Sequence, residues 1–139
     1  MATRSAIGIE TDGKIVAIYC HWDGYIEHNG EILYRHYQTP KKILEMIALG
    51  DLSSLGAEIG EKHDFDSRTH TNWCTYYGRD RGEEGVECRQ FVTPAKMIDW
   101  YSDCEYFYLW SQGEWKYSTR GAWHSLKDAV ESIDAERAQ

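Results

Sequence analysis

Three turn signals, each set between two runs of β-forming residues, constrain the fold more than any other feature of this sequence. The clearest is Asp12-Gly13, which separates Ile7–Glu10 from Ile15–Cys20. An Asp-Gly pair between such runs is typical of a two-residue hairpin turn, because its central residues adopt positive φ. Two further hairpins are expected, with paired runs at Trp73–Tyr77 and Val86–Val92, and at Glu105–Trp110 and Trp115–Ser118.

Four helices are expected around these hairpins. Thr39-Pro40 and Thr93-Pro94 each place a capping hydroxyl before a proline, which is a pattern of helix N-termini. Helical spacing after Glu31, with Asn29 as N-cap, predicts another helix, and Ser125 predicts the start of an amphipathic C-terminal one. The residues from 58 to 71 are polar and predict a long irregular connection.

These elements predict an α+β fold, with a mainly antiparallel, aromatic-rich sheet built from hairpins and about four helices packed on one of its faces. The chain has 139 residues, 42% of them hydrophobic, with six Trp and ten Tyr. A chain of this length and composition can bury a core of its own, so residues 1–139 are expected to form one domain. Residues 134–139 are expected to be a frayed, charged tail.

The formal net charge of −8 excludes several classes of partner. Its field repels phosphate, so general nucleic-acid binding and anionic membrane surfaces are disfavoured. It suits either a basic partner protein or solubility alone. The four cysteines form no CxxC pair, and no apolar run is long enough for a membrane span, so we expect free thiols and a cytoplasmic protein.

The strand predicted at Glu105–Trp110 carries large apolar residues at every position from 106 to 110. Neighbouring strand residues point to opposite faces, so both faces of the sheet are aromatic or aliphatic there. A second subunit could cover one of these faces. We therefore expect a homo-oligomer.

Two loops, 21–30 and 78–85, form the candidate ligand site. Arg79 and Arg81 are planar donors suited to phosphate, and the glycines beside them permit close backbone approach. Aromatic rings next to them could stack on a base, so the ligand would be a nucleotide-like anion. Alternatively, the arginines pair with neighbouring acids and the rings fill the core. The candidate ligand-binding residues are Trp22, Asp23, Tyr25, Tyr76, Tyr77, Arg79 and Arg81.

A weaker constellation could hold a metal. The segment with His63, Asp64, Asp66, His70 and Cys74 offers ligand types that zinc binds, and His63, His70 and Cys74 are the weak candidates, but the spacing matches no standard zinc pattern. The fold is therefore expected not to need a metal, and no cofactor is expected. Cys20 and His21 cannot form a catalytic dyad, because neighbours on a strand point apart. No catalytic residue is assigned.

The segments MATRSAIGIETDGKIVAIYCHWDGYIEHNG, GDLSSLG, CTYYGRDRGEE and the aromatic run before GEW carry a family resemblance. The chain resembles a group of small proteins encoded by bacteriophages and prophages. The resemblance implies a viral origin and a place in the host cytoplasm. The hypothesis that follows is a non-catalytic accessory protein that interferes with host defence, by sequestering a nucleotide-type signal or by blocking a host protein. A small metal-dependent hydrolase or nuclease is the alternative.

Overall fold

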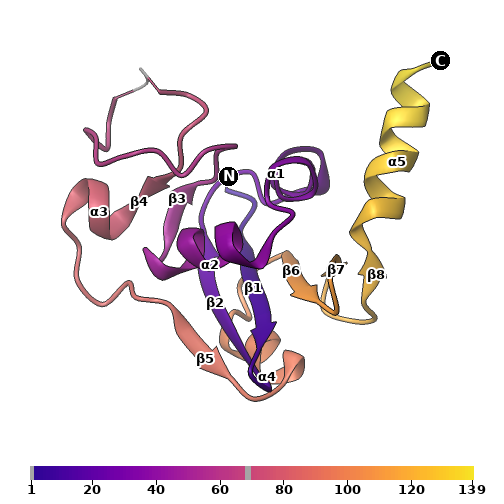
Figure 1. Cartoon of the computed structure of the whole chain (residues 1–139), viewed down its shortest axis with the longest axis horizontal. Coiled ribbons are helices and arrows are strands. Elements are labelled where there is room, and N and C mark those ends of the chain that lie inside the picture. Colours follow the sequence, from indigo (N-terminus) through magenta and orange to yellow (C-terminus); the bar gives the residue numbers. More distant parts are fainter. Residues whose placement is uncertain (1, 68–69) are drawn as a thin grey trace.

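The computed structural model describes residues 2–67 and 70–139, which form an α+β domain around one mixed sheet (Figure 1). The strands are β1 (Ser5–Thr11), β2 (Lys14–Cys20), β3 (Leu52–Ser54), β4 (Thr75–Tyr76), β5 (Arg89–Phe91), β6 (Tyr106–Ser111), β7 (Glu114–Ser118) and β8 (His124–Ser125). The α-helices are α1 (Glu31–His36), α2 (Pro40–Ala48), α3 (Tyr77–Arg81), α4 (Pro94–Trp100) and α5 (Leu126–Arg137), and a π-helical turn at Ile26–Gly30 precedes α1.

The strands follow the order β4-β3-β2-β1-β6-β7-β8, and β5 pairs with β2 beside β3. The predicted α+β class is confirmed, but the sheet is mixed rather than built from hairpins alone. β1 runs parallel to β6, and β2 runs parallel to β3. Both parallel pairs join segments that are distant in the sequence, which local turn signals cannot reveal.

Two of the three predicted hairpins are confirmed, namely β1–β2 and β6–β7. In each turn two successive residues have positive φ, Asp12 and Gly13 in the first and Gln112 and Gly113 in the second. This is the backbone that a two-residue hairpin turn requires.

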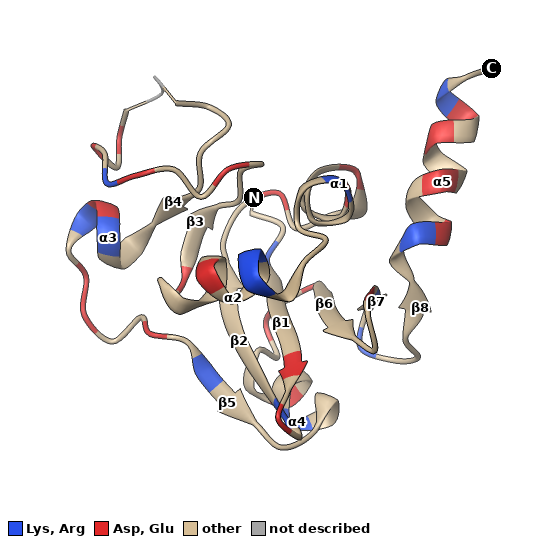
Figure 2. Ribbon diagram, viewed as in Figure 1, with Lys and Arg blue, Asp and Glu red and all other residues tan. Residues whose placement is uncertain are grey.

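The predicted second hairpin is wrong. Residues after β4 turn into α3, which ends at Gly82 with a φ of 75°. β4 then pairs with β3, and β5 pairs with β2, so the two predicted partners never meet. Figure 2 shows acidic residues along the connection between α3 and β5.

Three of the predicted helix starts are confirmed by their capping bonds. The side chains of Thr39, Thr93 and Ser125 accept the backbone N–H three residues further on, at the N-termini of α2, α4 and α5. Asn29 is not the cap of α1. Its buried amide donates to Ser5 Oγ at 3.2 Å, tying the loop after β2 to β1. α5 continues to Arg137, beyond the start of the tail expected at residue 134.

The core lies on both faces of the sheet, so the expectation of helices on one face is corrected. Helices α1, α2 and α5 cover one face and α4 covers the other. Strand β6 contributes to both, with Tyr108 and Trp110 in the first layer and Phe107 and Leu109 in the second. All four of these side chains are buried within the chain itself.

Candidate functional site

Of the two loops predicted to form one ligand site, one lines a groove in the structure and the other does not line it. Loop 21–30 lines a groove of about 380 Å³ at the carboxyl end of β2. Segment 78–85 contributes no residue to its lining. The groove is lined by Trp22, Asp23, Ser53, Ser54, Phe65, Asp66 and Thr75, and we call it the Trp22 groove.

Arg79 does not line the Trp22 groove, and with Gly78 and Glu83 it lines a separate hollow of about 370 Å³. Its guanidinium donates to the carbonyls of Ile59 at 3.0 Å and Cys74 at 2.9 Å, and to the carboxylate of Asp80 at 3.0 Å. The side chain is only 12% exposed. The prediction of an exposed phosphate clamp on a hairpin tip is not supported at this position, because the donors are used within the chain.

Arg81 is exposed but also engaged. Its guanidinium donates to Glu83 at 2.5 and 3.0 Å, and it lies over the ring of Phe65 at 4.5 Å and that of Tyr77 at 5.0 Å. This matches the alternative interpretation of the sequence, in which the arginines pair with neighbouring acids.

The candidate tyrosines also separate. Tyr76 is buried and its hydroxyl donates to the carbonyl of Met46 at 2.8 Å, so it belongs to the core. Tyr77 is half-buried against Phe65, with ring centroids 5.6 Å apart. Tyr25 is exposed, and its hydroxyl donates to Asp23 at 3.3 Å. The Asp23 carboxylate raises the pKa of Tyr25, because it disfavours a second negative charge beside it.

The loop that carries Trp22 and Asp23 is held in a defined shape. Trp22 N–H donates to the Ser53 carbonyl at 3.0 Å, and the buried Asn29 amide donates to the Trp22 carbonyl at 3.3 Å. Asp23 has a φ of 57°, a conformation that few residues other than glycine adopt. Aspartate adopts it more readily than most other residues with a side chain.

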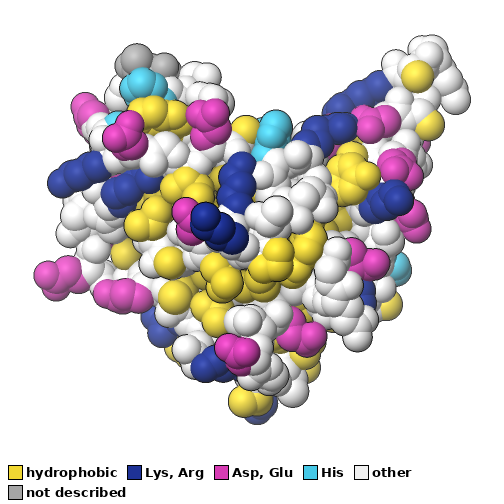
Figure 3. All heavy atoms as spheres, in the orientation of Figure 1, with side chains coloured by type: hydrophobic (Ala, Val, Ile, Leu, Met, Phe, Trp, Pro, Cys, Tyr) yellow, Lys and Arg dark blue, Asp and Glu magenta, His cyan; other side chains and the backbone are white. Residues whose placement is uncertain are grey.

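The Trp22 groove combines aromatic faces, carboxylates and hydroxyls. Trp22 is 44% exposed and Phe65 lies partly buried, so both rings have accessible surface. Asp23 and Asp66 add negative charge, and no Lys or Arg lines the groove within residues 2–67 and 70–139. A smaller hollow of about 130 Å³ shares Ser54 and Thr75 with it. Figure 3 shows acidic and histidine side chains gathered around hydrophobic ones near the 61–73 segment.

The lining residues that the sequence did not assign to this ligand site are Ser53, Ser54, Phe65, Asp66 and Thr75, of which Asp66 was considered only among the metal ligands. The two serines lie in the GDLSSLG segment, but nothing local shows that β3 pairs beside the end of β2. Phe65 and Asp66 lie in the irregular connection, whose position depends on long-range contacts.

Of the weak metal candidates, His63 and His70 lie side by side with ring centroids 6.2 Å apart, while Cys74 is bonded elsewhere. Cys74 is buried, and its sulfur contacts the Tyr37 hydroxyl at 3.3 Å and accepts from Gly56 N–H at 3.3 Å. His70 stacks on Trp73 with ring centroids 3.8 Å apart, and His63 Nε2 lies 3.2 Å from Thr75 Oγ1. In the described part of the chain, no group of three or more His, Cys, Asp or Glu is placed to hold a metal ion.

All four cysteines are free thiols, and Cys20, Cys74 and Cys104 are buried. Burial raises the pKa of Cys20 to about 12 and that of Cys104 to about 12. Such thiols stay protonated at neutral pH and are poor nucleophiles. Among the described residues, no helix combines the length and apolar character needed to cross a membrane.

Comparisons with family models, with curated proteins and with solved structures found no match for this chain. The groove and its chemistry therefore carry the functional argument.

Proposed function

We propose that this protein is a non-catalytic binding protein that blocks a partner protein by holding one of its arginine or lysine side chains in the Trp22 groove. The observation that carries this proposal is the lining of the groove, which joins two carboxylates and two aromatic faces without a Lys or Arg among the described residues.

The charges favour a basic ligand over a phosphate. A phosphate group would lie near Asp23 and Asp66, with no lining cation among the described residues to compensate it. A guanidinium or ammonium group would gain from both carboxylates. The net charge of −8 acts in the same direction, because it steers basic partners toward the surface.

The aromatic rings suit the flat guanidinium of arginine in particular. Cations lie favourably over aromatic faces, and arginine adds planar stacking. Phe65 already binds one guanidinium within this chain, that of Arg81, at 4.5 Å from its centroid. The hydroxyls of Ser53, Ser54 and Thr75 can accept hydrogen bonds from the remaining N–H donors of the ligand.

This proposal keeps the blocking of a host protein from the sequence hypothesis, but it places the site in the Trp22 groove. It retains a phage accessory protein that interferes with host defence by blocking a host protein in the host cytoplasm. In this proposal Arg79 and Arg81 do not bind the ligand, in contrast to the sequence hypothesis. The metal-dependent hydrolase has no supporting observation, because His63, His70 and Cys74 each have partners within the fold.

The proposal is tested by calorimetric titration with a short glycine-serine peptide that carries one arginine, and with the same peptide carrying citrulline. Citrulline has the shape of arginine without its charge. We expect binding of the arginine peptide and weaker or no binding of the citrulline peptide. Asp23→Asn should weaken arginine binding by about 1.5–3 kcal/mol, the worth of a charge-assisted hydrogen bond. Asparagine tolerates the positive φ at this position, so the fold should be kept.

Glu84→Gln is the matched control, because it removes an exposed carboxylate outside the groove. Equal binding of the two peptides would rule out the proposed site. So would a Glu84→Gln variant that loses as much affinity as Asp23→Asn.

A further inference from the structure

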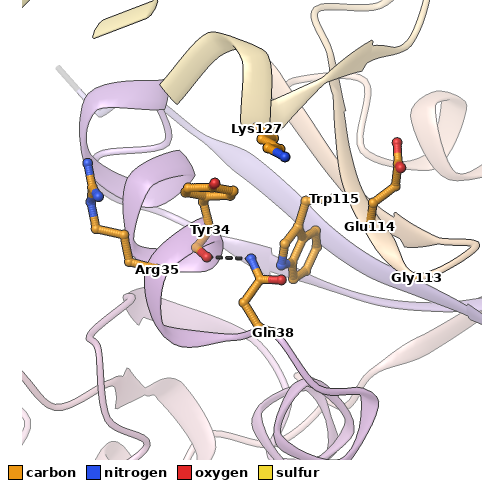
Figure 4. A pocket seen from close by; sticks show the side chains of 7 residues that line it. All are labelled: Tyr34, Arg35, Gln38, Gly113, Glu114, Trp115 and Lys127. Carbon is orange, nitrogen blue, oxygen red and sulfur yellow. Dashed lines mark hydrogen bonds between the residues drawn. The ribbon is translucent and has the colours of Figure 1, made fainter. Parts of the chain in front are cut away.

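A second hollow lies away from the Trp22 groove. It has a volume of about 720 Å³, within the usual range for small-molecule sites. Its lining comes from the end of α1, the β6–β7 turn and the start of α5 (Figure 4). We call it the Tyr34 cavity, and its lining residues are Tyr34, Arg35, Gln38, Gly113, Glu114, Trp115 and Lys127.

The walls of the Tyr34 cavity are fixed by bonds between distant segments. The Tyr34 hydroxyl donates to Glu131 on α5 at 3.3 Å, and Arg35 pairs with Asp134 at 2.6 Å. The Trp115 indole N–H donates to the Tyr37 carbonyl at 2.8 Å. A ligand entering this cavity would meet rings already held in place, which reduces the entropy lost on binding.

The cavity contains a cation that the fold leaves free. Within the described residues the ammonium group of Lys127 has no hydrogen-bond or ion-pair partner, while Arg35 is engaged by Glu31 and Asp134. Figure 4 shows Lys127 reaching from α5 toward the space between Tyr34 and Trp115. The free ammonium group of Lys127 beside the two rings gives an anion a local contact, although the net charge of −8 acts against it.

Gln38 adds a hydrogen-bond acceptor next to the rings. Its Nε2 donates to the Tyr34 carbonyl, so Oε1 is the atom left to accept a bond from a ligand. An amino group on the edge of a planar base can donate to such an acceptor. Glu114 lies beyond Trp115, where its carboxylate can accept from sugar hydroxyls.

From these features we propose that the Tyr34 cavity binds a purine nucleoside monophosphate with an exocyclic amino group. The base stacks on Tyr34 and donates to Gln38, and the phosphate contacts Lys127. The site is independent of the Trp22 groove, because the two linings share no residue. It also differs from the nucleotide site expected at Arg79 and Arg81.

The test is calorimetric titration of the whole chain with adenosine monophosphate, inosine monophosphate, adenosine and inorganic phosphate. Adenosine monophosphate should bind most tightly. Inosine monophosphate lacks the amino group, so it should lose the Gln38 contact. Adenosine lacks the phosphate that contacts Lys127, and inorganic phosphate lacks the base that stacks on Tyr34. Lys127→Gln should weaken binding of adenosine monophosphate about 10- to 100-fold, as expected for a charge-assisted hydrogen bond.

Lys96→Gln is the control for charge, since Lys96 is exposed on α4, which covers the other face of the sheet. It should leave the affinity unchanged, and so should Trp22→Ala. The proposal fails if adenosine monophosphate binds no better than inorganic phosphate, or if Lys127→Gln and Lys96→Gln behave alike. The proposal would also fail if Trp22→Ala lost binding of adenosine monophosphate and Lys127→Gln kept it, since the ligand would then occupy the Trp22 groove.

Discussion

At the scale of single residues, Arg79 is predicted from the sequence to bind a ligand, and in the structure its donors are used within the chain. Its guanidinium crosslinks the irregular connection to the segment around β4, through the carbonyls of Ile59, Gly60 and Cys74. Its partner Asp80 has a side chain with no exposed surface. The sequence shows an arginine near glycines. The carbonyls of Ile59 and Gly60 that accept its hydrogen bonds come from a distant segment and are brought to it only by folding.

Replacing Arg79 should therefore destabilise the fold. Arg79→Ala leaves the buried Asp80 carboxylate without its guanidinium partner, and breaking a buried ion pair in this way costs about 3–5 kcal/mol. Arg81→Ala removes an exposed pair with Glu83 and should change the free energy of unfolding by less than about 1 kcal/mol. Urea denaturation of both variants compares them. Equal stability would show that Arg79 is not a structural crosslink.

The same pair gives a direction for acid stability. Burial raises the pKa of Asp80, but hydrogen bonds from Arg79 and from the backbone N–H of Tyr76 and His63 outweigh it, so the pKa is lowered. A carboxyl with a lowered folded pKa stabilises the protein above its unfolded pKa of about 4, and this stabilisation is lost as the pH falls below that value.

At the scale of elements, the sequence predicts the helix starts and tight turns, because neighbouring residues determine them. The caps Thr39, Thr93 and Ser125 and the two-residue turns needed only neighbouring residues, and they were predicted correctly. The pairing of β4 with β3 and of β5 with β2 depends on contacts between distant segments. The strand-like runs on either side of residues 78–85 were therefore joined to each other instead of to the existing sheet.

Asp51 lies at the junction created by these long-range pairings. Along the edge of β2, β5 pairs at residues 15–17 and β3 pairs at Cys20. Between them, Tyr19 N–H donates to the Asp51 carboxylate at 2.9 Å. Burial raises the pKa of Asp51 to about 6, although the Tyr19 bond and the charge of Arg89 oppose the shift.

This junction predicts a pH-dependent stability. The folded protein binds the Asp51 proton more tightly than the unfolded chain, so this group contributes stability that is lost as the pH rises from about 4 to about 6. Asp51→Asn keeps an oxygen for Tyr19 N–H but cannot ionise. We expect it to flatten this part of the stability profile and to be at least as stable as the parent at pH 8.

Thermal unfolding between pH 4 and pH 8 measures the effect, with Asp99→Asn as the control for an exposed carboxylate on α4. An Asp51→Asn profile parallel to that of the parent would show that Asp51 does not titrate in this range.

At the scale of the whole molecule, the candidate site illustrates what a sequence leaves open. Trp22 and Asp23 were predicted to bind a ligand, and they do line a groove. The charge of that groove depends on Asp66, and its second ring on Phe65, both placed by a connection without regular structure. The proposed ligand is therefore a cation, whereas the sequence alone predicts an anion.

The predicted self-association needs a surface other than β6, because both faces of β6 are covered within the chain. The strand offers no face to a second subunit, because its residues from Phe107 to Ser111 are buried. One surface left open is the outer edge of β5, which pairs only with β2 within the described part of the chain. Val92 and Trp100 lie beside it and are 73% and 57% exposed, the largest values among the exposed large hydrophobic residues.

We expect two chains to associate through this edge as a two-fold dimer, because an unpaired strand edge beside exposed apolar side chains is self-complementary. Light scattering coupled to size exclusion, at micromolar concentration, should give twice the mass of one chain. Val92→Asp should shift the protein to monomer, because its charge would be buried in the contact. Leu44→Asp, at an exposed leucine on α2, is the control and should leave the dimer intact. A parent chain that runs as a monomer would overturn the expectation, and a dimer that survives Val92→Asp would assign the contact to another surface.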